Sequence, residues 1–187
     1  MKLYIKNMVC DRCKMVVKTE LEKLGFNPIY VTLGEVEIAE KQVNTKQITA
    51  LQLMLNGFGF ELLTDKKKQL VEQIKAIIIE LAHYGTDALK VNLSAYLSEK
   101  LVVDYTHLSA IFSEVEQSTI EKYFIKQKIE KVKELLSYGE ISLSEIANLL
   151  NYSSVAHLSA QFKKITGQTP SQYKSNQKVV RKTLDQI

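Results

Sequence analysis

The feature that most constrains the fold of this chain is an internal repeat in its second half. When residues 93–123 are laid over residues 143–173 without gaps, nine of the thirty-one positions carry the same residue. Both copies contain the run His-Leu-Ser-Ala, one variable residue and Phe, which begins at His107 and at His157. A constant offset of fifty residues indicates a duplicated supersecondary unit. Any fold for this chain therefore has to accommodate the same small module twice.

Each copy reads as two helices separated by a tight turn. In the clearer second copy, apolar residues at three- and four-residue steps predict helices over 143–150 and 154–165, with a turn at 151–153. Ala147 is small enough to let two helices cross closely, and Asn151 tolerates a left-handed turn. This spacing is that of a helix-turn-helix unit.

A long amphipathic helix is expected over 121–137, between the two copies. Its length would hold the modules about 25 Å apart. Successive major grooves on one face of DNA lie roughly 34 Å apart. We therefore expect both modules to reach one duplex.

The second helix of each module has an apolar and a polar face. The apolar positions, expected to face the core, are Leu108, Ile111, Phe112 and Val115, and then Leu158, Phe162 and Ile165. On the other face, small side chains allow close approach to base edges, and lysines pair with phosphate. The candidate DNA-binding residues are Tyr105, Thr106, Ser109, Ala110 and Ser113 in the first copy, and Ser154, Val155, Ala156, Ser159, Ala160, Lys163 and Lys164 in the second.

Two alternatives accompany this interpretation. The repeat could be a helical scaffold in which Ser and Ala simply favour an exposed surface. His107 and His157 occupy equivalent positions and fit packing or phosphate contact better than metal ligation.

Residues 66–175 resemble the DNA-binding domain of the AraC/XylS family. The match is strongest over 141–174, where the shared positions are Ile146, Ala147, Phe162, Lys163, Lys164, Gly167, Thr169, Pro170 and Tyr173. The resemblance implies an all-α domain with two helix-turn-helix modules that binds double-stranded DNA. The first copy departs from the family at Leu101 and Gln117, where a turn Gly or Asn and a Gly are usual. Ala110 and Ala160 stand where the family commonly has arginines.

Residues 1–64 alternate between strand and helix patterns. The expected helices cover 10–24, closed by Gly25, and a segment capped by Asn44 or Thr45 and stopped by Gly57 and Gly59. The expected strands are 2–6, 28–33, 36–39 and 60–63. The order β-α-β-β-α-β predicts a ferredoxin-like α+β domain ahead of the all-α domain. The junction between them is short.

The chain has two cysteines, Cys10 and Cys13, placed at the start of the first predicted helix. Unpaired N–H groups and the helix dipole favour thiolates there. Two sulfurs three residues apart can chelate one soft metal ion, and thiolate pairs suit Cu(I). Zinc fits less well because it wants four ligands. A thiol-disulfide switch and a domain without a ligand remain open alternatives.

The same 64 residues resemble the heavy-metal-associated domain of copper-transporting ATPases and metallochaperones. Residues 8–13, Met-Val-Cys-Asp-Arg-Cys, match its M-x-C-x-x-C loop. The resemblance implies that Cys10 and Cys13 bind the metal, that Met8 packs beneath the loop, and that a metallochaperone is a candidate partner. Phe60 resembles an aromatic residue found near the site in that family. Asn7 and Val9 replace the usual Gly and the usual Thr or His.

Charge and hydropathy fit these two parts. Residues 1–65 hold eight Lys and Arg against eight Asp and Glu, whereas residues 66–187 hold seventeen against thirteen. A positive second half suits a polyanion such as DNA. No secretory signal or membrane span is recognisable, so we expect a cytoplasmic protein. Residues 176–187 read as a basic tail.

The sequence thus predicts a DNA-binding transcription regulator, not an enzyme, that responds to a soft metal bound at Cys10 and Cys13. One alternative is a regulator that responds to thiol oxidation. Another is a metal-transfer module with constitutive DNA binding. A monomer and a homodimer are both open, because one chain already carries two modules.

Overall fold

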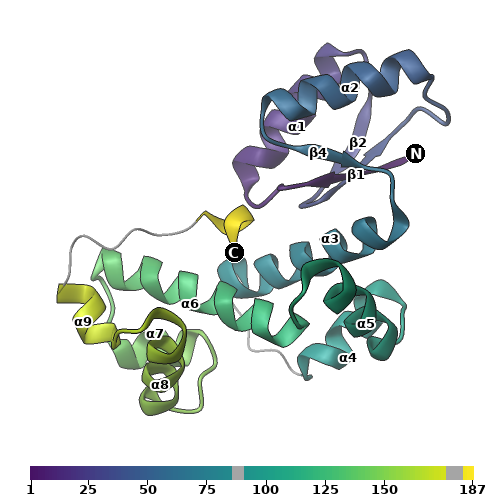
Figure 1. Ribbon diagram of the computed structural model, residues 1–187. Coiled ribbons are helices and arrows are strands. Elements are labelled where there is room, and N and C mark those ends of the chain that lie inside the picture. Colours follow the sequence, from purple (N-terminus) through teal and green to yellow (C-terminus); the bar gives the residue numbers. More distant parts are fainter. Residues whose placement is uncertain (86–90, 176–182) are drawn as a thin grey trace. The chain divides into compact units, whose positions relative to one another are not determined.

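The computed structural model describes residues 1–85, 91–175 and 183–187 (Figure 1). The chain divides into two compact units. The first consists of residues 1–77 together with 106–117, and the second of residues 78–105 together with 118–187. The domain limits 1–64 and 66–175 stay a prediction from sequence.

The first unit contains a four-stranded sheet with the strand order β2-β3-β1-β4. Every neighbouring pair of strands is antiparallel. The strands and the two helices that connect them follow the order β-α-β-β-α-β along the chain. They are β1 (Lys2–Lys6), α1 (Asp11–Lys23), β2 (Pro28–Val31), β3 (Glu35–Ile38), α2 (Thr45–Gly57) and β4 (Glu61–Leu63).

Helices α1 and α2 lie over one face of this sheet and bury a single apolar core (Figure 1). The core joins Val17 and Leu21 of α1, Leu51 and Leu55 of α2, and alternate residues of the strands such as Ile5, as period-two patterning requires. Local signals delimit the helices. Asn44 forms a capping box with Gln47 at the start of α2, and Gly25 adopts the left-handed conformation (φ +80°) after α1.

The first unit also contains most of α3 (Lys66–Ile79), as far as Ile77, and nearly all of α5 (Tyr105–Glu116). The spacing of Leu70, Ile74, Ile77, Ile78 and Leu81 predicts one helix over 69–84, closed by Gly85. The helical run does end at Tyr84, but it starts three residues earlier and its last turn is not α-helical. The helix begins at Lys66 because the Asp65 carboxylate accepts a hydrogen bond from the Lys68 N–H at 2.9 Å. Beyond Ile79 the chain widens into a π-helical turn, η1 (Glu80–Tyr84), before Gly85.

The second unit is helical. Its elements are η1, α4 (Leu93–Leu101), α6 (Ile120–Tyr138), α7 (Leu143–Leu149), α8 (Val155–Thr166), α9 (Pro170–Ser175) and the 3₁₀ turn η2 (Leu184–Gln186). Ile129 and Val132 of α6, Ile146 of α7, and Leu158 and Phe162 of α8 form its main core. Within the described residues, no helix combines the length and apolar character needed to cross a membrane.

One residue predicted to face this core does not. Ile165, in the last turn of α8, is 43% exposed. The space beneath that turn is already filled, because the rings of Phe162 and Tyr173 meet edge to face with centroids 5.4 Å apart. In the first copy, Leu108, Ile111 and Phe112 are buried as expected, whereas Val115 is half-buried.

Candidate nucleic-acid interface and dithiol site

The second repeat copy forms a compact helix-turn-helix, and its local sequence explains each boundary. Ser142 and Glu145 make a capping box at the start of α7. Asn151 adopts the left-handed conformation (φ 54°), which a non-glycine residue tolerates best when it is Asn or Asp. Ser154 caps α8 by accepting a hydrogen bond from the His157 N–H at 3.1 Å. The predicted left-handed turn at Asn151 is therefore confirmed, and of the two serines able to cap the second helix, Ser153 and Ser154, it is Ser154 that does so.

Close helix crossing is also confirmed. Ala147 is 1% exposed within the core shared by α6, α7 and α8. Its carbonyl oxygen accepts a hydrogen bond from the Tyr152 N–H at 2.9 Å, which closes the turn after α7. Packing on one side thus fixes the orientation of α8, and its opposite face carries exposed residues.

That outer face carries the residues predicted to meet DNA. Among them, Ala156, Ala160, Lys163 and Lys164 are exposed, while Val155 and Ser159 are half-buried and Val155 also packs against the core. The exposed face therefore combines small side chains along its length with two ammonium groups in its last turn. Small residues let a helix approach base edges, and the lysines suit phosphate.

The corresponding residues of α5 repeat this pattern of exposure. Thr106 and Ala110 are exposed, whereas Tyr105, Ser109 and Ser113 are half-buried. The Tyr105 hydroxyl donates a hydrogen bond to the Glu121 carboxylate, and burial together with this bond raises the pKa of Tyr105. Sequence reasoning missed that bond, which occupies a hydroxyl otherwise available to a base.

The turn of the first copy differs from the expected one. At an offset of fifty residues, Leu101 corresponds to Asn151, but the left-handed residue is Val102 (φ 55°). Gln117 (φ 50°) matches the left-handed Gly167 (φ +80°) at that offset. A β-branched residue in this conformation is an outlier and carries a steric cost. Of the two departures in the sequence, Gln117 itself holds a left-handed backbone, whereas at Leu101 the left-handed conformation falls on the next residue, Val102.

The two histidines of the repeat lie on the surface. His107 and His157 are both exposed, and His157 Nδ1 lies 3.0 Å from Ser153 Oγ. The His157 ring also meets the Tyr152 ring edge to face at 5.4 Å. These contacts agree with a packing role for His157.

The two cysteines form a second candidate site, in the first unit. Cys10 occupies the N-cap position of α1, and Cys13 lies in the first turn, so that their Sγ atoms are 3.4 Å apart. The Cys13 thiol also donates a weak hydrogen bond to the Asn7 carbonyl oxygen at 4.0 Å. Met8 is 1% exposed and belongs to the core beneath this loop.

The pKa of the Cys13 thiol is affected more by burial than by the position of Cys13 at the start of α1. Desolvation raises the pKa of the Cys13 thiol, and the backbone hydrogen bond at Val9 only partly opposes this. The positive charge of Lys14, next to Cys13 in the sequence, is paired with Asp11 at 2.6 Å. At Cys13, burial therefore opposes the thiolate that the start of a helix favours.

The donor set at this site suits a soft ion with few ligands. Within the described parts of the chain, no group of three or more His, Cys, Asp or Glu side chains comes together in a way that would hold a metal. Two sulfurs in contact distance match the preference of soft cations for thiolates. A four-coordinate zinc ion would need donors that this site does not supply.

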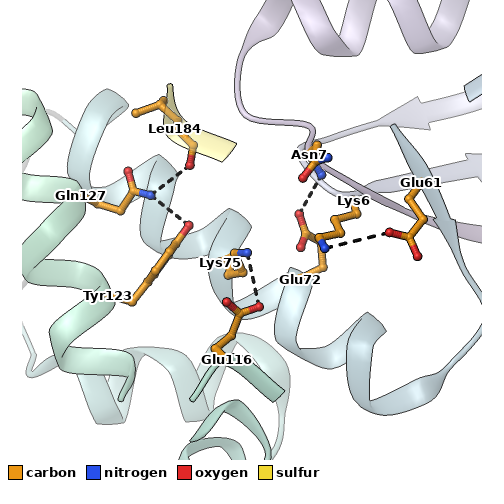
Figure 2. Close-up of polar contacts among 9 residues, drawn as sticks. All are labelled: Lys6, Asn7, Glu61, Glu72, Lys75, Glu116, Tyr123, Gln127 and Leu184. Atoms are coloured by element: carbon orange, nitrogen blue, oxygen red, sulfur yellow. Dashed lines mark hydrogen bonds and ion pairs between the residues drawn. The ribbon is translucent and has the colours of Figure 1, made fainter. Parts of the chain in front are cut away.

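A residue next to the dithiol loop connects it to α3 (Figure 2). The backbone N–H of Asn7 donates a hydrogen bond to Glu72 Oε1 at 3.2 Å, and the Asn7 side-chain amide donates to the Gly59 carbonyl oxygen at 2.9 Å. Asn7 adopts φ 71°, a left-handed conformation that Asn tolerates better than most residues other than Gly. Nothing in the sequence pointed to Glu72, which lies 65 residues further along.

Comparison with known proteins supports the helical part of the site. A family model described as a helix-turn-helix domain matches residues 97–176. The chain is 29% identical over 107 residues to the Msm operon regulatory protein of Streptococcus mutans, covering 57% of this chain and 36% of that protein. It is 26% identical over 113 residues to the probable transcriptional regulator LumQ of Photobacterium leiognathi, covering 60% and 44%. The chain thus spans less than half the length of either relative.

Two solved structures share the fold. The C-terminal domain of AraT, a response regulator from Geobacillus stearothermophilus, superposes with a TM-score of 0.52 at 24% identity, covering 64% of this chain and 94% of that one. A transcriptional regulator from Chromobacterium violaceum, described as AraC-type DNA-binding domain-containing, gives 0.51 at 15% identity, covering 61% and 97%. Both likenesses concern the architecture of the helices.

Proposed function

We propose that this chain, which contains a helix-turn-helix domain of the AraC type, is a sequence-specific DNA-binding transcription regulator that responds to a soft metal ion. The observation that carries the DNA-binding part is the outer face of α8, where Ala156 and Ala160 lie exposed ahead of Lys163 and Lys164. Its buried face is fixed by Leu158 and Phe162. A rigid helix with small outward side chains is suited to the major groove.

Two modules in one chain support recognition of an extended site. The outer faces of α5 and α8 both contact base edges through Ser and Ala side chains. Because Ala110 and Ala160 have no guanidinium group, neither position can discriminate bases through the bidentate hydrogen bonds of an arginine. Affinity then depends strongly on phosphate contacts and hence on salt. We expect modest base discrimination per module and a need for both modules.

The metal-responsive part rests on Cys10 and Cys13. We propose that residues 1–64 form a ferredoxin-like domain of the heavy-metal-associated type; the order of its elements and the antiparallel order β2-β3-β1-β4 support this. Cys10 and Cys13 would hold the ion, with Met8 supporting the loop from the core. These two side chains would bind Cu(I) as thiolates, so that loading would release their thiol protons. Another soft metal would use the same donors, and a metallochaperone is the expected source.

The 3.4 Å approach of the two sulfurs also favours a second candidate, a thiol-disulfide switch. In that reaction the two thiols give up two protons and two electrons to a disulfide oxidant, and one S–S bond of about 2.0 Å forms. This candidate needs the same two cysteines but no metal. A metal-transfer module with constitutive DNA binding is the outcome in which metal binds and DNA affinity does not change.

A single set of measurements separates these functions. Reduced protein is titrated with Cu(I) against a competing chelator, alongside Cys10→Ser and Cys13→Ser. Each form is then tested by fluorescence anisotropy on the duplex that the wild type enriches from a random-sequence library. The proposal expects Cu(I) binding that either serine variant loses, and a change in DNA affinity on loading.

The alternatives predict other results. Loading that leaves the DNA affinity unchanged identifies a transfer module. A response to oxidised glutathione but not to Cu(I) identifies the redox switch. Enrichment of no duplex over competitor polyanions at any salt concentration would overturn the regulator assignment itself.

A further inference from the structure

Helix α3 contacts Asn7, beside the dithiol site, through Glu72, and it contacts α5 through Lys75, one helical turn further along (Figure 2). On the first side, the buried Glu72 carboxylate accepts the hydrogen bond from the Asn7 N–H at 3.2 Å. On the second side, Lys75 Nζ lies 3.4 Å from Glu116 Oε1, at the last residue of α5. All four residues belong to the first compact unit.

Asn7 touches the dithiol site directly. Its carbonyl oxygen accepts the weak hydrogen bond of the Cys13 thiol at 4.0 Å, while its N–H serves Glu72. A soft metal replaces the thiol proton, so the loaded site has no S–H to donate to this carbonyl. The free and loaded states therefore differ in a specific contact with Asn7, which any ligand-driven switch requires.

Loss of the Asn7 hydrogen bond would destabilise the Glu72 carboxylate, and space next to Glu72 would let its side chain move. A buried carboxylate that loses its donor is strongly destabilised. Beside it lies a cavity of about 350 Å³ that is also lined by Lys6 and Glu116. This space leaves room for the carboxylate to turn toward Lys6 if its donor is lost. A buried side chain with two such arrangements would be the kind of element through which sites are coupled.

Other contacts hold α3 against the sheet, so we expect a change at Glu72 to move its side chain and not the whole helix. Gln73 Nε2 donates a hydrogen bond to Glu35 Oε2 at 3.2 Å. Gly34 approaches α3 so closely that a Cβ there would lie 3.4 Å from Glu72 Cγ. Lys67, about two helical turns before Lys75 on α3, pairs with Glu114 of α5 at 2.6 Å.

We infer that Glu72 is a positioning residue that transmits the state of the Cys10–Cys13 site to α5, through Asn7 on one side and the Lys75–Glu116 pair on the other. This inference rests on the proposed function, because it assigns the route by which metal at the dithiol alters a helix predicted to meet DNA. It makes α3 the connecting element rather than a spacer between two domains.

Hydrogen-deuterium exchange with and without Cu(I) tests this route without DNA. In wild type, Cu(I) should change amide exchange in residues 7–13 and in α5. In Glu72→Gln and in Glu116→Gln, the change in residues 7–13 should persist and the change in α5 should disappear. Glu61→Gln is the matched control, because Glu61 lines the same cavity but bonds neither Asn7 nor α5.

The same variants are then compared on the selected duplex. Wild type and Glu61→Gln should show the ratio of DNA affinities typical of allosteric coupling, about 5–150-fold between loaded and free protein. Glu72→Gln should reduce this ratio to within about twofold while keeping Cu(I) affinity. Circular dichroism checks folding, and Glu116→Gln keeps the test valid if Glu72→Gln unfolds, since it leaves the Asn7 contact intact.

The outcomes distinguish this inference from the function on which it rests. If α5 responds to Cu(I) in both variants as in wild type, the route through Glu72 is wrong and the metal-responsive function stands. If residues 7–13 respond in wild type and α5 does not, the route is again wrong. If neither region responds because Cu(I) does not bind, the proposed function and the inference both fail.

Discussion

The ammonium group of Lys128 on α6 lies 3.9 Å from the centre of the Tyr152 ring, in the turn between α7 and α8. The hydroxyl of the same tyrosine donates a hydrogen bond to Gln161 Oε1 of α8 at 2.7 Å. Tyr152 therefore connects the turn of the second helix-turn-helix to α8 and to α6. Burial lowers the pKa of Lys128 to about 8 and raises that of Tyr152 to about 12. In the described part of the chain, Lys128 forms no ion pair with a carboxylate, and its electrostatic partners are the faces of the Tyr152 ring and, at 5.6 Å, the Phe124 ring.

A pH dependence of stability follows from Lys128. The unfolded chain keeps this proton up to the ordinary pKa of 10.5, whereas the folded chain releases it near 8. Between these values the unfolded state binds more protons, so this group makes folding more favourable as the pH rises. The free energy of unfolding of wild type should therefore increase relative to Lys128→Met from about pH 7.5 to about pH 9.5 in urea titrations. Lys126→Met, at an exposed position of the same helix, should run parallel to wild type. A constant difference between wild type and Lys128→Met would contradict the assignment.

The two apolar residues Phe162 and Ile165 of α8 should differ greatly in their contribution to stability. Phe162 is fully buried against Tyr173, so Phe162→Ala should lower the free energy of unfolding by about 3–5 kcal/mol. Ile165 is 43% exposed, and Ile165→Ala should cost less than about 1 kcal/mol. Chemical denaturation of both variants measures the difference. Equal losses would place Ile165 in the core, as its spacing in the sequence suggests.

Relief of the left-handed backbone at Val102 should stabilise the first module. Val102 has φ 55° and is 89% exposed, so its side chain loses little packing on removal. Val102→Gly should raise the free energy of unfolding by up to about 1 kcal/mol, because the steric cost removed exceeds the entropy that glycine adds to the unfolded chain. Val103→Gly serves as the comparison, since Val103 is half-buried and is not left-handed. That variant should be destabilised, and a loss of stability in both would argue against strain at Val102.

The lysines at the end of α8 should act through phosphate. Lys163→Gln and Lys164→Gln should each weaken binding to all duplexes and reduce the slope of log affinity against log salt by about 1. Lys126→Gln removes an exposed charge from α6 and should leave the slope unchanged. Anisotropy titrations at several salt concentrations supply the slopes. A variant that alters base preference with no change in slope would assign that lysine to base contact instead.

Features governed by local sequence were predictable. The repeat predicted α7, its turn and α8 to within a residue, because capping by Ser154 and the left-handed tolerance of Asn151 act within a few residues of each other. Asn44 and Gly25 delimited the helices of the sheet region for the same reason. The bounds of α6 also followed from its apolar periodicity.

Features that depend on distant partners were not predictable. Ile165 has the spacing of a core residue, but Tyr173, eight positions later, fills the space first. Helix periodicity gives no reason for Val102 rather than Leu101 to be left-handed. The contact of Asn7 with Glu72 joins residues 65 apart, and only the folded backbone brings them together. The candidate dithiol was visible from spacing, yet its connection to α3 was not.

The membership of α5 in the first unit bears on how such proteins can be recombined. A chimera that joins residues 1–65 to an unrelated DNA-binding domain would carry both cysteines and the whole sheet. It would leave behind Glu72, the acceptor of the Asn7 N–H, together with Lys75 and its partner on α5. The transplanted domain would keep Cys10 and Cys13 but lose α3, the helix through which their state is transmitted. A chimera made from this chain and a related protein should therefore keep the coupling between the cysteine site and α5 only when the crossover falls after residue 117.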